Sequence, residues 1–225
     1  MDNPNQEASF PIGSASADQP TGHTLDEILT QPQAWQAALD CVSQAQAALK
    51  KRWLETPFSD ILVTGCGSTY YLALATAPLL QQQLGRRARA TPASELLLFP
   101  ATVMPPDDCP LLMTISRSGR TSETIRATQA YKASQQKGFV LSIGCYPETD
   151  LVALSDLALI IEEGQEQSVV QTRSFSAMLV AVQAAVAALG GGSSLLQMQV
   201  LPVIGEQLIS TYHSLARQLG QDTSF

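Results

Sequence analysis

Short apolar runs alternate with amphipathic segments through the middle of the chain. Buried-strand character is found in the segments 61–63, 110–119, 139–147 and 156–164. Apolar side chains at three- and four-residue steps, which are typical of helices, occupy 68–85, 120–138 and 171–189, and residues 151–154 are predicted as a short connection. Apolar strands that alternate with helices indicate a parallel sheet with helices on both faces.

Two further amphipathic helices flank this pattern. The first is predicted over residues 33–54, with Pro32 suited to its first turn, and the second over 201–219. Each carries a single apolar stripe. The stripes suit docking onto a second domain or a second subunit, although packing on the chain's own sheet is equally permitted.

The composition limits the class of protein. With 225 residues, 45% of them hydrophobic, the chain is long enough for one domain with its own core. A net charge of −7 disfavours nonspecific binding to nucleic acid or to an acidic membrane surface, while leaving room for a local anion site. The longest apolar run is shorter than the roughly 20 residues of a spanning helix. Residues 1–22 lack the features of a signal peptide and are predicted as a flexible tail.

The cysteines argue against a structural metal. Four of them stand alone, without the paired spacing of a zinc site: Cys41, Cys66, Cys109 and Cys145. Scattered cysteines in a domain of this size indicate a reduced, cytoplasmic protein. Neither a metal nor an organic cofactor is expected.

Hydroxyl side chains gather where two of the predicted strands end. The bends are GCGSTY at 65–70 and SRSGRTS at 116–122, and each leads into a predicted helix. Helix N-termini present free backbone N–H groups and a favourable dipole to an anion, and hydroxyl groups add donors that fit tetrahedral oxygens. The two bends together predict a phosphate cradle. Ordinary helix capping explains any one of these hydroxyls taken alone.

Other phosphate motifs fit less well. The pattern GxxxxGK[ST] of nucleoside triphosphate loops does not occur. The first bend has two glycines of a dinucleotide fingerprint, but Tyr70 stands where the third should be. Nicotinamide binding is therefore disfavoured.

At these residues the sequence resembles the SIS (sugar isomerase) domain family. Four segments occur in the family's order: DEILTQPQAW, GCGSTYY, SRSGRTSET and EEGQEQSVVQTRSFSAML. The likeness covers roughly residues 24–190 and is to the first SIS domain in the isomerase half of glucosamine-6-phosphate synthase and in tagatose-6-phosphate ketose/aldose isomerases. It implies a three-layer α/β/α sandwich with a parallel, flavodoxin-like sheet, flanked by the amphipathic helices.

The resemblance also implies which residues bind the phosphosugar. They are Gly67, Ser68 and Thr69 of the first bend, Ser116, Arg117, Ser118 and Thr121 of the second, and Val169, whose backbone would approach the sugar hydroxyls. Arg117 stands where relatives often have Gln, so it would supply its backbone amide and its charge. Arg120 replaces a common Glu or Asn, and it is either a solvated side chain or a steering charge for the phosphate.

The catalytic residues stay unassigned. Relatives take the proton-moving glutamate, a lysine and the ring-opening histidine from a second SIS domain, which this sequence does not contain before Phe225. Asp2 stands where the synthase has its nucleophilic cysteine, so glutamine hydrolysis is not expected. The chain is therefore expected to be either the first half of a longer protein or a stand-alone single-domain member.

Several titratable residues are candidates for catalysis. His23 and His213 lie outside the matched motifs, and Glu123 is explained by the dipole of its helix. Glu166 directly precedes the segment that should face the sugar, and it is either a base or a structural acid. Arg173 either pairs with an acidic neighbour or binds the ligand.

The expected organisation has four parts. They are a tail at 1–22, a helical segment at 23–56, an SIS domain at 57–192 and a helix at 193–225 that leads toward a second SIS domain. The expected ligand is a hexose phosphate, such as fructose-6-phosphate or an amino-sugar phosphate. The expected function is part of an aldose–ketose isomerase, aminotransferase or deaminase, working as a homodimer. The alternative is a noncatalytic phosphosugar-sensing module.

Overall fold

The computed structural model describes residues 22–56, 58–104, 109–134, 138–191 and 193–222. The predicted N-terminal tail therefore lies outside the described residues, apart from Gly22. Within the described part, five parallel strands form one sheet in the order β2-β1-β3-β4-β5. Their bounds are Ile61–Gly65 for β1, Ala88–Pro92 for β2, Leu111–Ile115 for β3, Val140–Gly144 for β4 and Leu157–Ile160 for β5.

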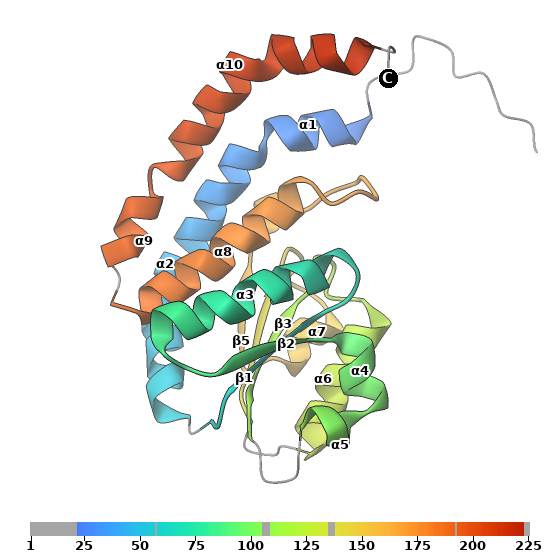
Figure 1. Ribbon diagram of the computed structural model, residues 1–225, viewed down its shortest axis with the longest axis vertical. Coiled ribbons are helices and arrows are strands. Elements are labelled where there is room, and N and C mark those ends of the chain that lie inside the picture. The colour runs from blue at the N-terminus through green and yellow to red at the C-terminus, as the bar shows by residue number, and fades with distance from the viewer. Residues whose placement is uncertain (1–21, 57, 105–108, 135–137, 192, 223–225) are drawn as a thin grey trace, which may run out of the picture.

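Helices cover both faces of this sheet (Figure 1). On one face lie α3 (Ser68–Leu84) and α8 (Arg173–Leu189), with α2 (Gln31–Glu55) packed against α8 and β5. On the other face lie α4 (Ala93–Leu98), α5 (Pro100–Val103), α6 (Ser122–Ser134) and α7 (Asp150–Leu154). The expected α/β/α sandwich with a parallel sheet is confirmed.

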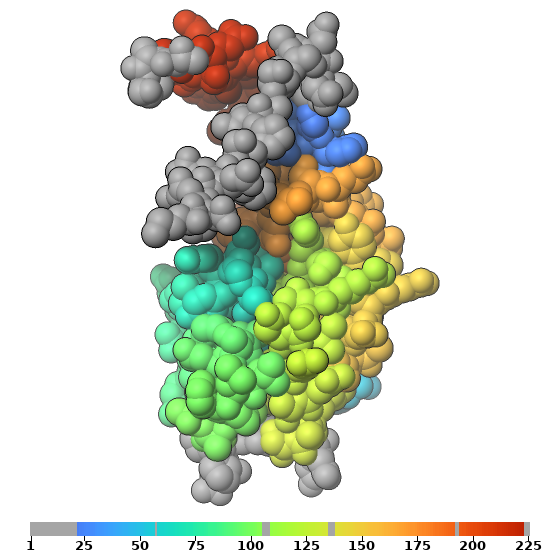
Figure 2. All heavy atoms as spheres, turned by 90° about the vertical axis from the view of Figure 1, so that its right-hand side faces the viewer, coloured from blue at the N-terminus to red at the C-terminus, as the bar shows by residue number. Residues whose placement is uncertain are grey.

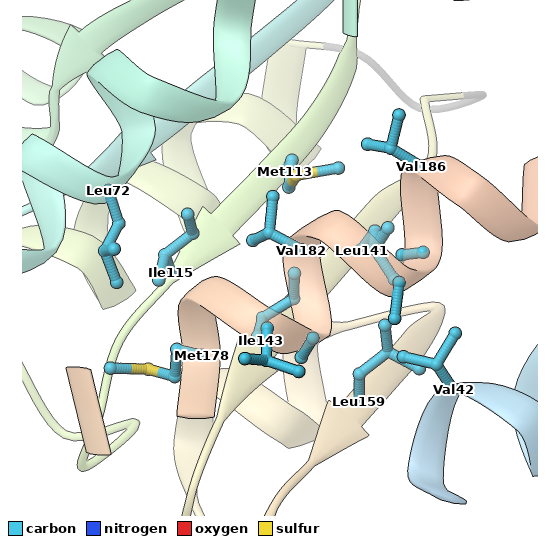
Figure 3. Close-up of a cluster of buried hydrophobic side chains, with 14 of the residues drawn as sticks. Val42, Leu72, Met113, Ile115, Leu141, Ile143, Leu159, Met178, Val182 and Val186 are labelled. Atoms are coloured by element: carbon cyan, nitrogen blue, oxygen red, sulfur yellow. The ribbon is translucent and has the colours of Figure 1, made fainter. Parts of the chain in front are cut away.

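The larger core lies between the sheet and the layer of α2, α3 and α8. Alternate strand residues point into it, because successive side chains of a strand face opposite sides. Figure 3 shows this packing, in which the strands contribute Met113, Ile115, Leu141, Ile143 and Leu159 and the helices contribute Val42, Leu72, Met178, Val182 and Val186. Strands β1, β3 and β4 are buried at every position, which explains why their sequences are mostly apolar.

The opposite face of the sheet has a smaller apolar core and a row of hydroxyls. Thr91, Thr64, Thr114 and Ser142 are paired in register across four strands, and all are buried. The hydroxyl of Thr64 donates to the carbonyl of Thr91 at 2.8 Å, and the hydroxyl of Ser155 donates to that of Ser142 at 2.8 Å. Polar side chains thus lie directly beneath the carboxyl ends of the strands.

Several elements differ from the sequence expectation. Strand β2 and helices α4 and α5 were not anticipated, and residues 151–154 belong to the one-turn helix α7 rather than to a plain connection. The strand predicted over 156–164 ends at Ile160, and Glu162–Gly164 form a 3-10 turn. Thr149 caps α7 by accepting a hydrogen bond from the amide of Val152 at 3.3 Å, a local signal that the apolar pattern does not contain.

The flanking helices were expected, and the structure gives their bounds. Helix α1 (His23–Leu29) precedes α2, and α9 (Ser193–Met198) precedes α10 (Leu201–Gln221). Pro32 lies in the first turn of α2, as expected. Beyond Gly205, which lies against Trp35 of α2, helix α10 extends away from the sheet (Figures 1 and 2). No helix in the described part of the chain combines the length and hydrophobicity of a membrane span.

The strand order brings the two hydroxyl-rich bends to one place. β1 and β3 are neighbours, with Thr64 opposite Thr114, so both strands end at the same edge of the sheet. The helices that follow them, α3 and α6, cover opposite faces. In a 2-1-3-4-5 sheet this is the point where the strand order reverses, and ligands bind in the crevice that opens there.

Candidate functional site

The first bend, which we call the elbow (residues 65–69), connects β1 to α3 through two glycines. Gly67 has a φ of +58°, a conformation that L side chains rarely adopt. A Cβ on Gly65 would lie 2.7 Å from the backbone of Thr69, so only glycine lets the helix start this close to the strand. The elbow thus fixes the N-terminus of α3 at the edge of the sheet.

Thr69 uses its hydroxyl within the elbow. The oxygen accepts a hydrogen bond from the amide of Cys66 at 3.1 Å and donates one to the carbonyl of Cys66 at 3.0 Å, and the residue is buried. Ser68 is exposed at the first position of α3. The elbow therefore presents backbone amides and the Ser68 hydroxyl, while the hydroxyl of Thr69 holds the turn itself.

The second bend, residues 116–121, rests on the end of β4. The amide of Ser116 donates to the carbonyl of Ile143 at 3.0 Å, and the amide of Cys145 donates to the carbonyl of Arg117 at 3.0 Å. Gly144 carries no side chain that would collide with this bend, since a Cβ there would lie 2.6 Å from the carbonyl oxygen of Ser116. The neighbouring strand therefore supports the 116–121 loop along its backbone.

Gly119 and Thr149 form a second support for this loop. Gly119 has a φ of +60°, and a Cβ at this position would lie 2.3 Å from the hydroxyl oxygen of Thr149. Thr149 is itself fixed because it caps α7. The turn at Gly119 is thus set both by backbone conformation and by contact with an ordered side chain.

The 116–121 loop contributes three hydroxyls with different surroundings. The Ser116 hydroxyl is buried and has no hydrogen-bond partner among the described residues. The Ser118 hydroxyl accepts from the amide of Arg120 at 3.2 Å, and Thr121 lies partly exposed directly before α6. Buried polar groups are normally paired, so the Ser116 hydroxyl is the one that most needs a further partner.

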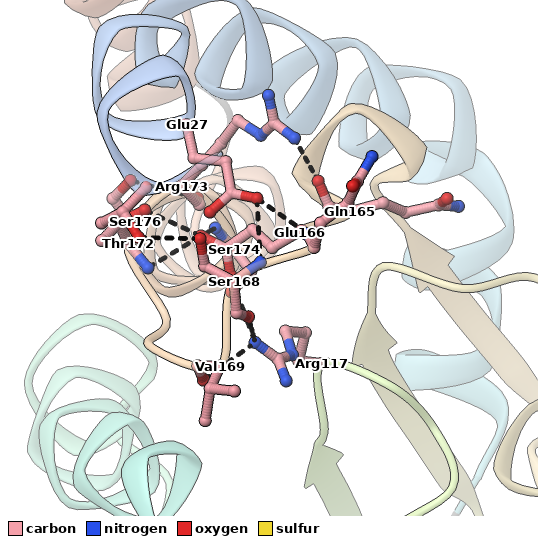
Figure 4. Close-up of polar contacts among 12 residues, drawn as sticks. Glu27, Arg117, Gln165, Glu166, Ser168, Val169, Thr172, Arg173, Ser174 and Ser176 are labelled. Atoms are coloured by element: carbon pink, nitrogen blue, oxygen red, sulfur yellow. Dashed lines mark hydrogen bonds and ion pairs between the residues drawn. The ribbon is translucent and has the colours of Figure 1, made fainter. Parts of the chain in front are cut away.

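A third segment, the 165–172 loop, reaches the same region from the start of α8. Val169 is 91% exposed, and its side chain points away from the loop (Figure 4). This loop carries the residue whose backbone was expected to approach the sugar. Its shape is set by two buried carboxylates and two arginines.

Glu166 caps helix α8 from within this loop. Its carboxylate accepts hydrogen bonds from the amides of Thr172 and Ser174 and from both of their hydroxyls. Burial alone would raise the pKa of Glu166, but these hydrogen bonds outweigh it and hold the pKa below its ordinary value. Glu166 is therefore an ionised structural acid, and the interpretation of this residue as a base is not supported by its surroundings.

Glu27 holds the loop from α1. Its carboxylate accepts from the amides of Gln167 at 2.7 Å and Ser168 at 3.2 Å. Burial alone would raise the pKa of Glu27, and the hydrogen bonds from Ser168 and Gln167 lower it below the ordinary value. The DEILTQP segment thus contributes a buried acid to the site's scaffold, a role that the sequence did not reveal.

The two arginines are also engaged with protein groups. Arg173 donates to the hydroxyl of Thr30 at 2.7 Å and to the carbonyl of Gln165, so it ties the loop to the junction of α1 and α2. Arg117 lies between the 116–121 and 165–172 loops, and its contacts with the second loop are visible in Figure 4. Neither side chain was expected to bind backbone carbonyls.

The candidate histidines do not complete a catalytic pair within the described residues. His23 borders a cavity of about 300 Å³ that Glu27, Glu166 and Arg173 also line. The two glutamates accept hydrogen bonds from the protein itself, which leaves them poorly suited to take a proton from a substrate. His213 lies on α10. No group of three or more His, Cys, Asp or Glu side chains in the described part has the arrangement of a metal site.

Comparison with known proteins identifies one domain family. The family model of the SIS domain matches residues 59–188. A glutamine–fructose-6-phosphate aminotransferase (isomerizing) of Shewanella oneidensis is 28% identical over 211 residues, which cover 89% of this chain and 33% of that protein. The chain thus spans about a third of this relative's length.

Solved structures show the same fold. Tagatose-6-phosphate ketose/aldose isomerase from Escherichia coli has a TM-score of 0.73 at 22% identity, covering 87% of this chain and 54% of that one. Glucosamine-6-phosphate deaminase from Thermotoga maritima has a TM-score of 0.67 at 24% identity, covering 84% and 55%. The chain therefore corresponds to about half of each solved protein.

We expect Gly119→Ala to lower the free energy of unfolding more than Gly85→Ala does. Both glycines have a positive φ, near +60°, but a Cβ on Gly85 would meet no atom within 4 Å. Each substitution incurs a backbone strain of about 1–3 kcal/mol, and only Gly119→Ala adds the collision with Thr149. Chemical denaturation of both variants measures the difference, and equal losses would show that Thr149 yields without cost.

Glu166→Gln should destabilise the fold by about 1.5–3 kcal/mol near neutral pH, the range for hydrogen bonds to a charged group. Because the folded pKa is lowered, the carboxylate's contribution is present above the unfolded pKa of about 4.3 and is lost as the pH falls through the folded pKa. The gap between wild type and variant should therefore shrink in acid. Denaturation curves at several pH values test this.

Glu163→Gln is the matched control, because Glu163 is an exposed acid close to the same loop. We expect it to change the free energy of unfolding little at any of these pH values. A gap for Glu166→Gln that stays constant into strong acid would contradict the assigned role of the ionised carboxylate.

Proposed function

The chain belongs to the SIS domain family, and on this premise we propose that it binds a hexose phosphate at the reversal point of its sheet. The phosphate would lie between the elbow and the 116–121 loop, and the sugar would extend toward Val169. Donors for the phosphate would come from the hydroxyls of Ser116, Ser118 and Thr121 and from the amides at the starts of α3 and α6.

One observation carries this proposal above the others. Ser116 directly follows β3, and its hydroxyl is buried and has no partner among the described residues. A buried donor in this setting is stabilised by an acceptor that the protein does not supply. A phosphate oxygen supplies such an acceptor, and the dipoles of two helix N-termini favour its charge.

The role of Thr69 in this proposal is indirect. Its hydroxyl bonds to the backbone of Cys66 and so shapes the elbow, while Gly67 and Ser68 present the amides of the first turn. The side chain of Arg117 likewise points to the 165–172 loop, so this residue would serve the phosphate through its backbone.

For the reaction class, we infer a role in aldose–ketose isomerisation, amino transfer or deamination of a sugar phosphate, as the names of the similar proteins suggest. Such chemistry needs a base near the carbon proton. Glu166 and Glu27 are committed to the scaffold. The base would therefore come from residues beyond this site, such as those of a second domain or a second subunit.

A noncatalytic phosphosugar sensor is the competing function. The carboxylates of Glu166 and Glu27, which are engaged with the protein scaffold, are also compatible with a sensor, because binding needs no base. Incubation with fructose-6-phosphate, glucosamine-6-phosphate and tagatose-6-phosphate, with both affinity and proton exchange at carbon 2 followed, separates the two. Exchange by the chain alone would support the enzyme, and binding without exchange would favour the sensor or a catalytic part supplied from elsewhere.

The double variant Ser118→Ala and Thr121→Ala is expected to weaken phosphosugar binding by about 1–3 kcal/mol, because hydrogen bonds to a charged group are lost. Calorimetric titration measures the change. Ser134→Ala is the control, since it removes an exposed hydroxyl from the far end of α6. An unchanged affinity in the double variant would remove the 116–121 loop from the site.

We also propose that two copies associate through the outer face of α10. An apolar row is exposed along this helix: Ile204, Leu208, Tyr212, Leu215 and Leu219. Leu208→Glu with Leu215→Glu should then yield a monomer in sedimentation equilibrium, with an unchanged circular dichroism spectrum. A wild-type chain that sediments as a monomer would contradict the association.

The expected cytoplasmic location stays a prediction.

A further inference from the structure

Arg117 connects two loops that are far apart in the sequence. It belongs to the 116–121 loop, yet one terminal nitrogen of its guanidinium lies 3.1 Å from the carbonyl oxygen of Ser168 and 3.4 Å from that of Val169. The same nitrogen lies 3.5 Å from the Glu166 carboxylate, and the side chain is 23% exposed. Figure 4 shows the guanidinium beneath the 165–172 loop, at the end of β3.

The backbone of Ser168 is held on both sides. Its amide donates to the buried carboxylate of Glu27 at 3.2 Å, and its carbonyl accepts from Arg117 at 3.1 Å. Glu27 comes from α1 and Arg117 from the end of β3, so the two contacts fix the two peptide groups that flank Ser168 from different parts of the fold. Without Arg117, the segment up to Val169 would lose its contacts on the carbonyl side.

Arg120 offers a comparison within the same loop. It lies three residues further along, is exposed, and its side chain forms no hydrogen bond or ion pair with any residue that the structure describes. Of the two arginines, Arg120 is therefore the one whose charge is available to a ligand. The charge of Arg117 is already shared between a carboxylate and two carbonyls.

We propose that Arg117 is a positioning residue that joins the 116–121 loop to the 165–172 loop, so that the phosphate-binding and sugar-facing segments form one rigid unit. This inference rests on the proposed function of the same site. A charge-assisted hydrogen bond to a carbonyl restricts the peptide that carries it. Arg117 would thereby fix the backbone of Val169 at the place where sugar hydroxyls are expected.

The proposal predicts different changes in affinity for two ligands that share the phosphate group. Inorganic phosphate would need only the elbow and the 116–121 loop, whereas fructose-6-phosphate would also need the 165–172 loop. Arg117→Ala should therefore weaken fructose-6-phosphate binding by about tenfold, as expected when one or two hydrogen bonds fail. The affinity for inorganic phosphate should change by less than about threefold, and Arg117→Lys should recover much of the sugar-phosphate affinity, since an ammonium also donates to carbonyls.

A second measurement reports how well the 165–172 loop is ordered in the absence of any ligand. Hydrogen exchange followed by mass spectrometry should show faster exchange at the amides of residues 167 and 168 in Arg117→Ala, because their segment loses its carbonyl contacts. Arg120→Ala removes the same charge from the same loop and should leave this exchange unchanged. Exchange in β3 monitors the fold as a whole. Arg117→Met, which keeps the length of the side chain without a donor, replaces the alanine variant should the latter unfold.

The outcomes are distinct. Equal losses of affinity for phosphate and fructose-6-phosphate in Arg117→Ala would mean that Arg117 binds the phosphate directly, which would overturn the proposal. Unchanged exchange at residues 167 and 168 would overturn it as well. A wild-type chain that binds neither ligand would instead contradict the proposed function, while the exchange measurement would still decide whether Arg117 orders the loop.

Discussion

The carboxylate of Glu166 is the buried charge around which the 165–172 loop is organised. Its side chain is fully buried, and an ion in that position is costly unless its oxygens are compensated. The start of α8 supplies two amides and two hydroxyls, and Arg117 adds a cation at 3.5 Å. The loop is therefore held in the arrangement that satisfies this carboxylate, and the position of Val169 follows from it.

The same constraint decides what the two buried acids can do chemically. A general base has to take up a proton at the working pH, whereas hydrogen bonds hold the pKa of both Glu166 and Glu27 below the ordinary value. One oxygen of each carboxylate, Oε1, accepts from backbone amides of the 165–174 segment. Oε2 of Glu166 accepts from the hydroxyl of Ser174, whereas Oε2 of Glu27 is buried without a partner among the described residues. Both carboxylates thus preserve the geometry of a binding surface, and proton transfer needs a different group.

Much of the fold could be predicted because the strands β1, β3 and β4 are buried on both faces and each begins with a run of two or three apolar residues. β2 was missed for the opposite reason. It lies at an edge of the sheet, and only Ala88 and Thr91 of its five residues are buried, so it has no apolar run. The helix α7 is a single turn capped by Thr149, too short to show helical periodicity.

Some features of the candidate site depend on residues that are adjacent in the sequence, and others depend on contacts between distant segments. The hydroxyls at the ends of β1 and β3 could be predicted, because strand, bend and helix are adjacent in the sequence. The partners of Glu27 lie 140 and 141 residues away, and those of the Arg117 side chain lie 51 and 52 residues away, so no local pattern indicates them. Arg117 and Arg120 look alike in the sequence, but only the first has backbone carbonyls within reach. The roles of the two arginines therefore follow from where the chain places the 165–172 loop, which is a property of the folded molecule.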